Sequence, residues 1–179
     1  NKSYLLGNPY PSALDAIPFL NNNSVLDGTL YFWTHNSNVT AVGAFYEYSD
    51  NDYATYNLTG GTGVASTNPG VSTSPPTGKI AAGQGFFATG IATGPINFPN
   101  AMRVGVGSIT GDNSQFFRTT KTKSKTSTAI EKNRVWLNLY NNEGAFKQTL
   151  VGYLAGATNG YDNRYDGESF DEHEFVDFY

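Results

Sequence analysis

The chain has 179 residues, a formal net charge of −4, 15% aromatic residues and no cysteine. This length suits one domain, or one domain and part of a second, and it is enough to bury a core without cross-links. The aromatic content excludes a disordered chain, the negative charge argues against a nucleic-acid binder, and no apolar run is long enough for a membrane-spanning helix. The lack of cysteine excludes disulfides and thiolate chemistry.

Short apolar and aromatic runs alternate with stretches rich in Gly, Asn, Pro, Ser and Thr, which is typical of an all-β chain. We expect strands, in chain order, at Ser3–Leu6, Thr29–Thr34, Ala41–Tyr48, Tyr53–Leu58, Gly85–Thr89, Ile96–Phe98, Met102–Val106, Gln115–Arg118, Arg134–Tyr140, Phe146–Leu154 and Glu174–Phe178. One short helix is expected over Ser12–Leu20, capped by Ser12 and limited by Pro18. The sequence therefore predicts an antiparallel β-sandwich or jelly roll with at most one short helix near the N-terminus.

The clearest supersecondary element is a hairpin over Arg134–Leu154, with its turn at Asn141–Gly144. Both faces of its strands are partly apolar, as in a strand covered on both sides. We therefore expect the hairpin in the core, with four residues buried: Val135, Leu137, Leu139 and Leu150.

A basic low-complexity stretch divides the chain. Residues 119–131, rich in Thr, Lys and Ser, are expected to form a mobile loop. Residues 1–118 are then a β-sandwich module, and residues 132–179 are a hairpin region that belongs to the same module or to a truncated following one.

Catalytic motifs are missing from the sequence. His35 and His173 stand outside any zinc-protease motif, and no nucleophile-elbow motif occurs. Asp50 and Asp52 lie in a run typical of a hairpin turn. We predict no catalytic residues and a non-enzymatic chain, although the activity of the parent protein is open. An enzyme whose carboxylates converge in a cleft is the alternative.

An acidic loop near the C-terminus is a candidate calcium site. Asp162, Asp166 and Glu168 could supply three oxygen ligands, and Ca²⁺ takes six to eight. Their spacing differs from that of the helix-loop-helix calcium motif, and Arg164 lies among them. A structural turn in which Arg164 pairs with a carboxylate is therefore favoured over the calcium site.

Aromatic residues occupy consecutive positions in two predicted strands. Tyr31 and Trp33 share one face of the first strand, and Tyr46 and Tyr48 share one face of the other. If the strands are neighbours and these faces point outward, the four rings form a platform on which a glycan could stack. If the faces point inward, the rings are core, which is the favoured interpretation.

Several segments in order resemble a region near the C-terminus of large secreted proteins of Bacteroidetes, especially flavobacteria. They are Leu6–Ala13, Leu30–Asn36, Asp52–Asn57, Gly83–Phe87, Gln115–Arg118, Gly144–Tyr153 and Gly156–Asp162. In those proteins the region precedes a type IX secretion sorting domain and continues past the position of Tyr179 into further strands. The resemblance implies an extracellular or outer-surface location and export by the type IX machinery of the parent protein, and it supplies no catalytic residues.

Two non-enzymatic functions remain open. The first is a structural or adhesive module of a secreted, cell-surface protein, with other surface proteins or glycans as partners. The second is a carbohydrate-binding module of a polysaccharide-degrading or adhesive parent. The aromatic rings alone support the second function.

Overall fold

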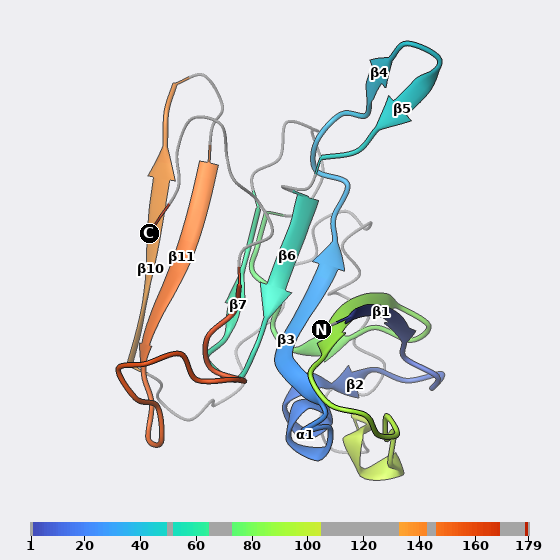
Figure 1. Ribbon diagram of the computed structural model, residues 1–179, viewed down its shortest axis with the longest axis vertical. Coiled ribbons are helices and arrows are strands. Elements are labelled where there is room, and N and C mark those ends of the chain that lie inside the picture. The colour runs from blue at the N-terminus through green and yellow to red at the C-terminus, as the bar shows by residue number, and fades with distance from the viewer. Residues whose placement is uncertain are drawn as a thin grey trace.

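The computed structural model describes residues 2–49, 52–64, 73–104, 133–142, 146–168 and 178. A five-stranded antiparallel sheet dominates this part of the chain, with the strand order β1-β9-β3-β6-β7. Its strands are β1 (Lys2–Gly7), β3 (Leu26–Trp33), β6 (Tyr53–Tyr56), β7 (Gly61–Thr62) and β9 (Gly85–Gly90). Figure 1 shows this sheet at the centre of the molecule.

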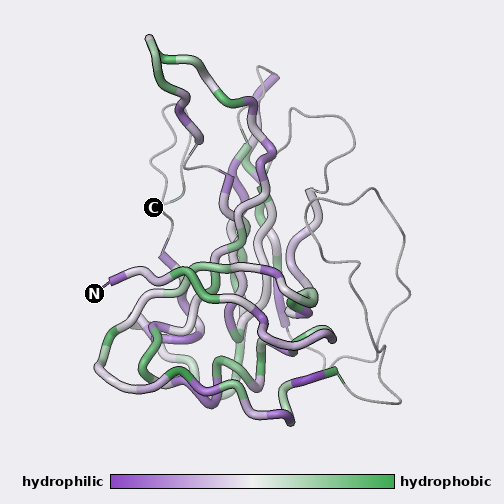
Figure 2. Tube along the Cα trace, turned by 90° about the vertical axis from the view of Figure 1, so that its right-hand side faces the viewer, coloured by the Kyte–Doolittle hydropathy of each residue, from purple (hydrophilic) through white to green (hydrophobic). Residues whose placement is uncertain are grey.

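Three two-stranded units accompany the large sheet. They are the pairs of β2 (Leu14–Asp15) with β8 (Lys79–Ile80), β4 (Thr40–Val42) with β5 (Phe45–Glu47), and β10 (Asn133–Tyr140) with β11 (Phe146–Tyr153). The β4–β5 hairpin projects away from the body, and β11 lies beside β7 (Figure 1). Apolar residues mark the projecting hairpin in Figure 2.

The single α-helix of the described residues is α1 (Ala16–Asn22), which begins four residues later than the start expected at Ser12. Its N-cap is Asp15, whose carboxylate accepts a hydrogen bond from the Ile17 N–H. Pro18 stands in the first turn, where a missing N–H costs nothing. A 3₁₀ turn, η2 (Asn100–Met102), packs against α1.

The hydrophobic core lies between the large sheet and α1. Phe19 of α1 meets Phe86 of β9 edge to face, with ring centroids 5.5 Å apart, and Phe86 also packs on Phe32 of β3. The other buried members of this cluster are Leu14, Ala16, Leu20, Leu26, Leu30, Ala54, Tyr56, Ile80, Ala88 and Met102. Leu26, Leu30 and Phe32 of β3 therefore face α1, which we call the inner face, and Tyr31 and Trp33 face outward.

These features confirm the expected all-β antiparallel fold with one short helix near the N-terminus. In the described residues, α1, η2 and the small β2–β8 sheet cover the inner face, so a sandwich of two large sheets stays a prediction. The expected strands Gln115–Arg118 and most of Glu174–Phe178, and the expected mobile loop of residues 119–131, lie outside the described residues.

Three expected elements differ from the structure. The predicted strand Met102–Val106 begins instead in the 3₁₀ turn η2, and its residues 105–106 lie outside the described residues. Residues 41–48 form a hairpin instead of one strand, because Gly43 turns the chain with φ +63°. The predicted strand Ile96–Phe98 has no partner strand in the described part of the chain, and its two outer side chains pack against the core.

The placement of the β10–β11 hairpin in the core is wrong. Its two strands pair antiparallel, from Asn133 opposite Tyr153 to Tyr140 opposite Phe146, but Val135 is 55% exposed and Leu137 is 45% exposed. Leu139 and Leu150 are half-buried. The hairpin is anchored beside the sheet: the Trp136 indole N–H donates to the Gly61 carbonyl at 3.0 Å.

The buried tyrosine Tyr56 predicts how stability depends on alkaline pH. Burial raises its pKa from 10 to about 12, so between these pH values the unfolded chain loses this proton and the folded chain keeps it. The free energy of unfolding should be nearly constant up to about pH 10 and fall by about 2 kcal/mol by pH 12 through Tyr56 alone. Urea unfolding from pH 8 to pH 12 measures this loss.

Tyr56→Phe is the matched control, since it removes the ionisable hydroxyl and keeps the buried ring. It should reduce the alkaline loss of stability relative to the parent chain. Equal losses in the two proteins would contradict the assignment to Tyr56.

Candidate binding surface

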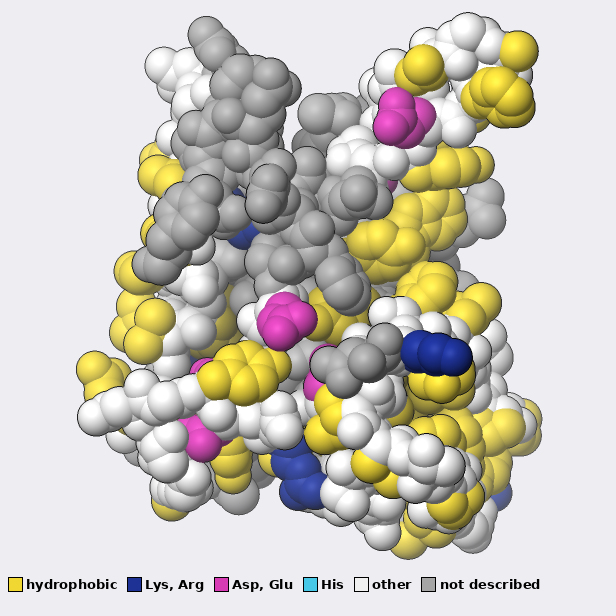
Figure 3. Space-filling view, in the orientation of Figure 1, with side chains coloured by type: hydrophobic (Ala, Val, Ile, Leu, Met, Phe, Trp, Pro, Cys, Tyr) yellow, Lys and Arg dark blue, Asp and Glu magenta, His cyan; other side chains and the backbone are white. Residues whose placement is uncertain are grey.

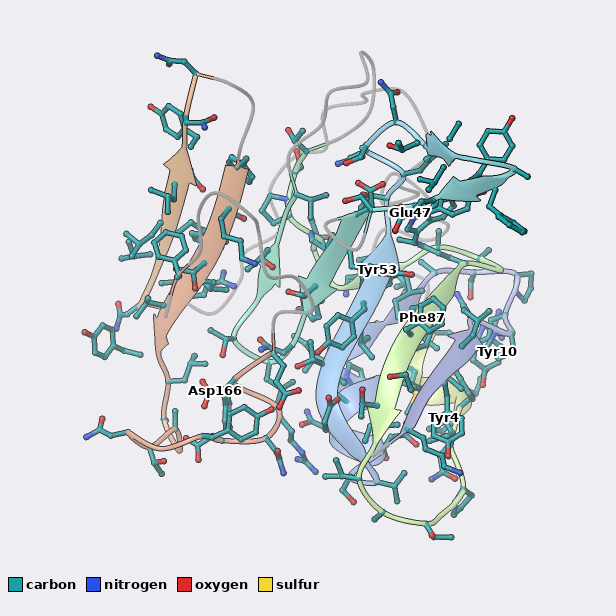
Figure 4. The ribbon with its side chains drawn as sticks, turned by 45° about the horizontal axis from the view of Figure 1, so that its top comes forward. Tyr4, Tyr10, Glu47, Tyr53, Phe87 and Asp166 are labelled. Atoms are coloured by element: carbon teal, nitrogen blue, oxygen red, sulfur yellow. The ribbon has the colours of Figure 1, made fainter. Side chains whose placement is uncertain are left out.

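The outer face of the large sheet carries a row of apolar and aromatic side chains. Trp33 of β3 is directly opposite Tyr53 of β6, and Phe87 of β9 is directly opposite Leu5 of β1. The Tyr53 and Phe87 rings meet edge to face above β3, with centroids 5.9 Å apart. Figure 4 shows these two labelled rings beside each other on the sheet.

The row continues from Trp33 toward the β4–β5 hairpin. The His35 ring stacks on Trp33 at 5.0 Å, and the Tyr48 ring stands edge to face against Trp33 at 5.7 Å. His35 has a positive φ of 52°, just beyond the end of β3. We call the set Leu5, Phe87, Tyr53, Trp33, His35 and Tyr48 the aromatic strip.

Much of the aromatic strip is in contact with solvent. Trp33 is 44% exposed, Tyr48 58% and Leu5 67%, whereas Tyr53 and Phe87 are partly buried against each other. Figure 3 shows apolar side chains running from the hairpin across the front of the sheet. A contiguous exposed apolar band of this kind makes the strip the candidate interaction surface of the described residues.

Hydrogen bonds to Asp52 fix the residues that follow Trp33 at the C-terminal end of β3. The Asp52 carbonyl accepts from the Thr34 N–H and the Thr34 hydroxyl, both at 2.8 Å. The buried Asp52 carboxylate accepts from the Ser37 N–H at 2.9 Å. Trp33 and His35 are therefore presented on a fixed turn rather than on a free loop.

Tyr31 must be removed from the predicted platform. It shares the outer face with Trp33, but it is 1% exposed because residues 158–168, the C-terminal segment, lie over it. The Tyr31 hydroxyl donates to the Glu168 carbonyl at 3.2 Å. Burial, with the negative charges of Asp27 and Glu168, raises the pKa of Tyr31 far above its usual range.

The C-terminal segment is attached to the sheet through backbone groups. The Arg164 N–H donates to the Asp27 carbonyl at 2.9 Å, and the Arg164 carbonyl accepts from the Leu58 N–H at 2.9 Å. The Tyr165 carbonyl accepts from both Asn57 and Thr59 side chains at 2.7 Å. The segment thus covers Tyr31, which lies directly opposite Phe87 and Thr55, while Trp33 and Tyr48 are exposed.

The other predicted platform residues lie on or beside the projecting hairpin. Tyr48 belongs to the strip, whereas Tyr46 stands on β5 with 74% of its surface exposed. β5 is not a neighbour of β3, whose partners in the sheet are β6 and β9. Sequence reasoning missed Tyr53 and Phe87, because their place in the strip depends on this strand order.

The acidic loop forms a turn in which its carboxylates accept hydrogen bonds from backbone N–H groups of the same loop. The Asp162 carboxylate accepts from the Thr158 N–H, and the Asp166 carboxylate accepts from the Asp162 N–H at 2.7 Å. Glu168 approaches Tyr31 through its carbonyl. Among the described residues, no three Asp, Glu or His side chains gather to hold an ion, and Arg164 forms no ion pair with a described carboxylate.

The turn and calcium interpretations of this loop predict different melting behaviour. An ion bound only by the folded chain would stabilise it, so a chelator would lower the melting temperature. The turn interpretation predicts the same melting temperature in excess chelator and in added Ca²⁺. A fall in chelator that Ca²⁺ reverses, and that Asp162→Asn abolishes, would instead establish a calcium site.

Residues 1–179 match one family model, described as Domain of unknown function (DUF8693). No curated protein and no solved structure matches the chain. In the described residues, no helix is long and apolar enough to cross a membrane.

Proposed function

Since the chain belongs to the DUF8693 family, whose description names no activity, we propose from its surface that it is a non-catalytic adhesive module of a secreted, cell-surface bacterial protein. The observation that supports this proposal is the aromatic strip, an open row of rings on a rigid sheet. Rings of this size contribute most of the binding energy in many protein interfaces.

The chemistry of the strip suits holding a partner more than transforming one. Its side chains offer apolar faces and ring edges, and the nearest acid on the hairpin, Glu47, is exposed to solvent. A general acid or nucleophile needs a partner group and a desolvated setting to acquire a useful pKa. The resemblance to the region preceding type IX sorting domains supports the outer-surface location and export by that machinery.

Adhesion can be measured with beads coated with the chain and washed over immobilised outer-surface material of flavobacterial cells. The double variant Trp33→Ala/Tyr48→Ala should lose most of the retained beads, because it removes two large exposed rings of the strip. The control Tyr140→Ala/Tyr153→Ala removes two rings that are even more exposed, from the β10–β11 hairpin, and should retain beads like the parent chain.

Equal retention by the strip variant and the parent chain would overturn the proposed function of this surface. If only the Tyr140→Ala/Tyr153→Ala variant loses bead retention, the adhesive surface is on β10 and β11 instead. Circular dichroism of each variant separates a lost contact from a lost fold.

A further inference from the structure

We propose that the aromatic strip binds a neutral, linear polysaccharide whose sugar rings lie along Phe87, Tyr53 and Trp33; this inference rests on the proposed adhesive function and names its ligand. The strip crosses the sheet from β1 over β9 and β3 to β6. Three steps between neighbouring strands span about 14 Å, and the His35 and Tyr48 rings extend the row further. An open row of this length fits a chain of sugars better than one small molecule.

Hydroxyl groups flank the rings on the same face of the sheet. On one side the Ser3 and Thr89 hydroxyls lie 3.5 Å apart, and on the other side those of Thr55 and Thr62 are hydrogen-bonded at 2.6 Å. Each of these hydroxyls can also donate to or accept from a ligand. A sugar offers an apolar ring face surrounded by hydroxyls, so rings bordered by hydroxyls match both parts of it.

The charge around the strip selects a neutral ligand. The outward strand positions Ser3, Leu5, Trp33, Tyr53, Thr55, Phe87 and Thr89 are uncharged. The charged groups beside them are acids: Asp27 accepts a hydrogen bond from the Thr89 side chain, and Glu168 lies at Tyr31, opposite Phe87. Between Trp33 and Tyr48 the chain has one acid, Glu47, and no Lys or Arg. Nucleic acids and acidic polysaccharides need basic side chains beside the rings, and membrane-surface helices likewise combine apolar rings with Lys or Arg.

The strip is also organised before the ligand arrives. Strand pairing fixes Tyr53 and Phe87, and the Asp52 hydrogen bonds fix the turn that follows Trp33. Binding then orders few side chains, which lowers the entropic cost of association. A weak ligand such as a polysaccharide can therefore be held by stacking and a few hydrogen bonds.

The two tryptophans of the chain allow a direct test, because one is in the strip and the other is on the β10–β11 hairpin. In the Trp136→Phe variant, Trp33 is the only indole, and its fluorescence is followed during titration with soluble β-glucan, xylan and chitin oligomers. We expect a saturable shift with at least one of them. Trp33→Phe, in which Trp136 is the only indole, is the matched control and should give no shift.

A second set of variants assigns the shift to the strip. Adding Tyr53→Ala or Tyr48→Ala to the Trp136→Phe protein should weaken the affinity about tenfold, the effect of losing one good ring contact. Tyr48 is on the exposed side of the turn, so its variant tests the ligand even if Tyr53→Ala unfolds. Unchanged affinity in folded Tyr48→Ala and Tyr53→Ala would overturn the proposed placement of the sugar.

Three outcomes of the titration would contradict the proposed carbohydrate ligand without contradicting the adhesive function. The first is no shift with any neutral glycan, although beads still adhere through Trp33 and Tyr48. The second is a shift with phosphatidylcholine vesicles only, and the third is a stronger response to polygalacturonate than to every neutral chain. If bead adhesion does not depend on the strip at all, the adhesive function fails instead.

Discussion

Leu30→Ala should lower the free energy of unfolding by about 2–5 kcal/mol, whereas Leu137→Ala should lower it by about 1 kcal/mol or less. Both leucines are in eight-residue strands, but Leu30 is fully buried among core side chains and Leu137 is 45% exposed on β10. Truncating Leu30 leaves a cavity between β3, β9 and α1 that the fixed strands cannot fill. Truncating Leu137 leaves a space that water can enter.

Urea unfolding at pH 7 measures both changes, with the slope of the transition as a check on the denatured state. Because the two substitutions delete the same atoms, the difference between them reports burial alone. Equal losses of several kcal/mol would mean that β10 is covered in solution, and they would contradict its exposed position.

This pair of leucines also shows where prediction from the sequence was accurate and where it failed. The two hairpin strands followed from local patterns, since alternating residues on either side of a turn-forming stretch indicate an antiparallel pair. Its burial did not follow, because a strand with apolar residues on both faces has the same pattern whether it is covered or exposed. The structure places the core on α1, Phe86 and Leu30 instead.

The candidate surface was predictable in part for a similar reason. Trp33 and Tyr48 were named from their aromatic runs as platform candidates, but the favoured interpretation placed them in the core, which is wrong because both are exposed. Tyr53 and Phe87 join them only because β6 and β9 flank β3, and a sequence does not state which strands are neighbours. Tyr31 is covered by residues more than a hundred positions later, a contact that no local pattern reports.

The covering of Tyr31 depends on Gly28. This glycine has φ +100°, and a Cβ atom there would lie 2.3 Å from the Arg164 Cα. A gap of 2.3 Å to a backbone atom cannot be relieved by rotating a side chain, so the C-terminal segment would have to move. Gly28→Ala is therefore expected to break the hydrogen bond between the Arg164 N–H and the Asp27 carbonyl and to expose Tyr31.

The expected loss of stability in Gly28→Ala is about 1–3 kcal/mol from backbone strain alone, and detachment of the C-terminal segment adds to it. Gly83→Ala is the matched control, because Gly83 also has a positive φ, of 69°, and its Cβ would meet nothing within 4 Å. The two variants share the strain, and only Gly28→Ala creates the clash.

Hydrogen exchange of the Arg164 and Leu58 amides, together with the chemical accessibility of Tyr31, distinguishes these effects. Gly28→Ala should accelerate exchange at both amides and make Tyr31 reactive, while Gly83→Ala leaves them protected. Because Tyr31 lies on the outer face directly opposite Phe87, its exposure would add one ring within the aromatic strip. Protection at Arg164 in Gly28→Ala equal to that in the parent chain would show that the C-terminal segment does not depend on the close approach at Gly28.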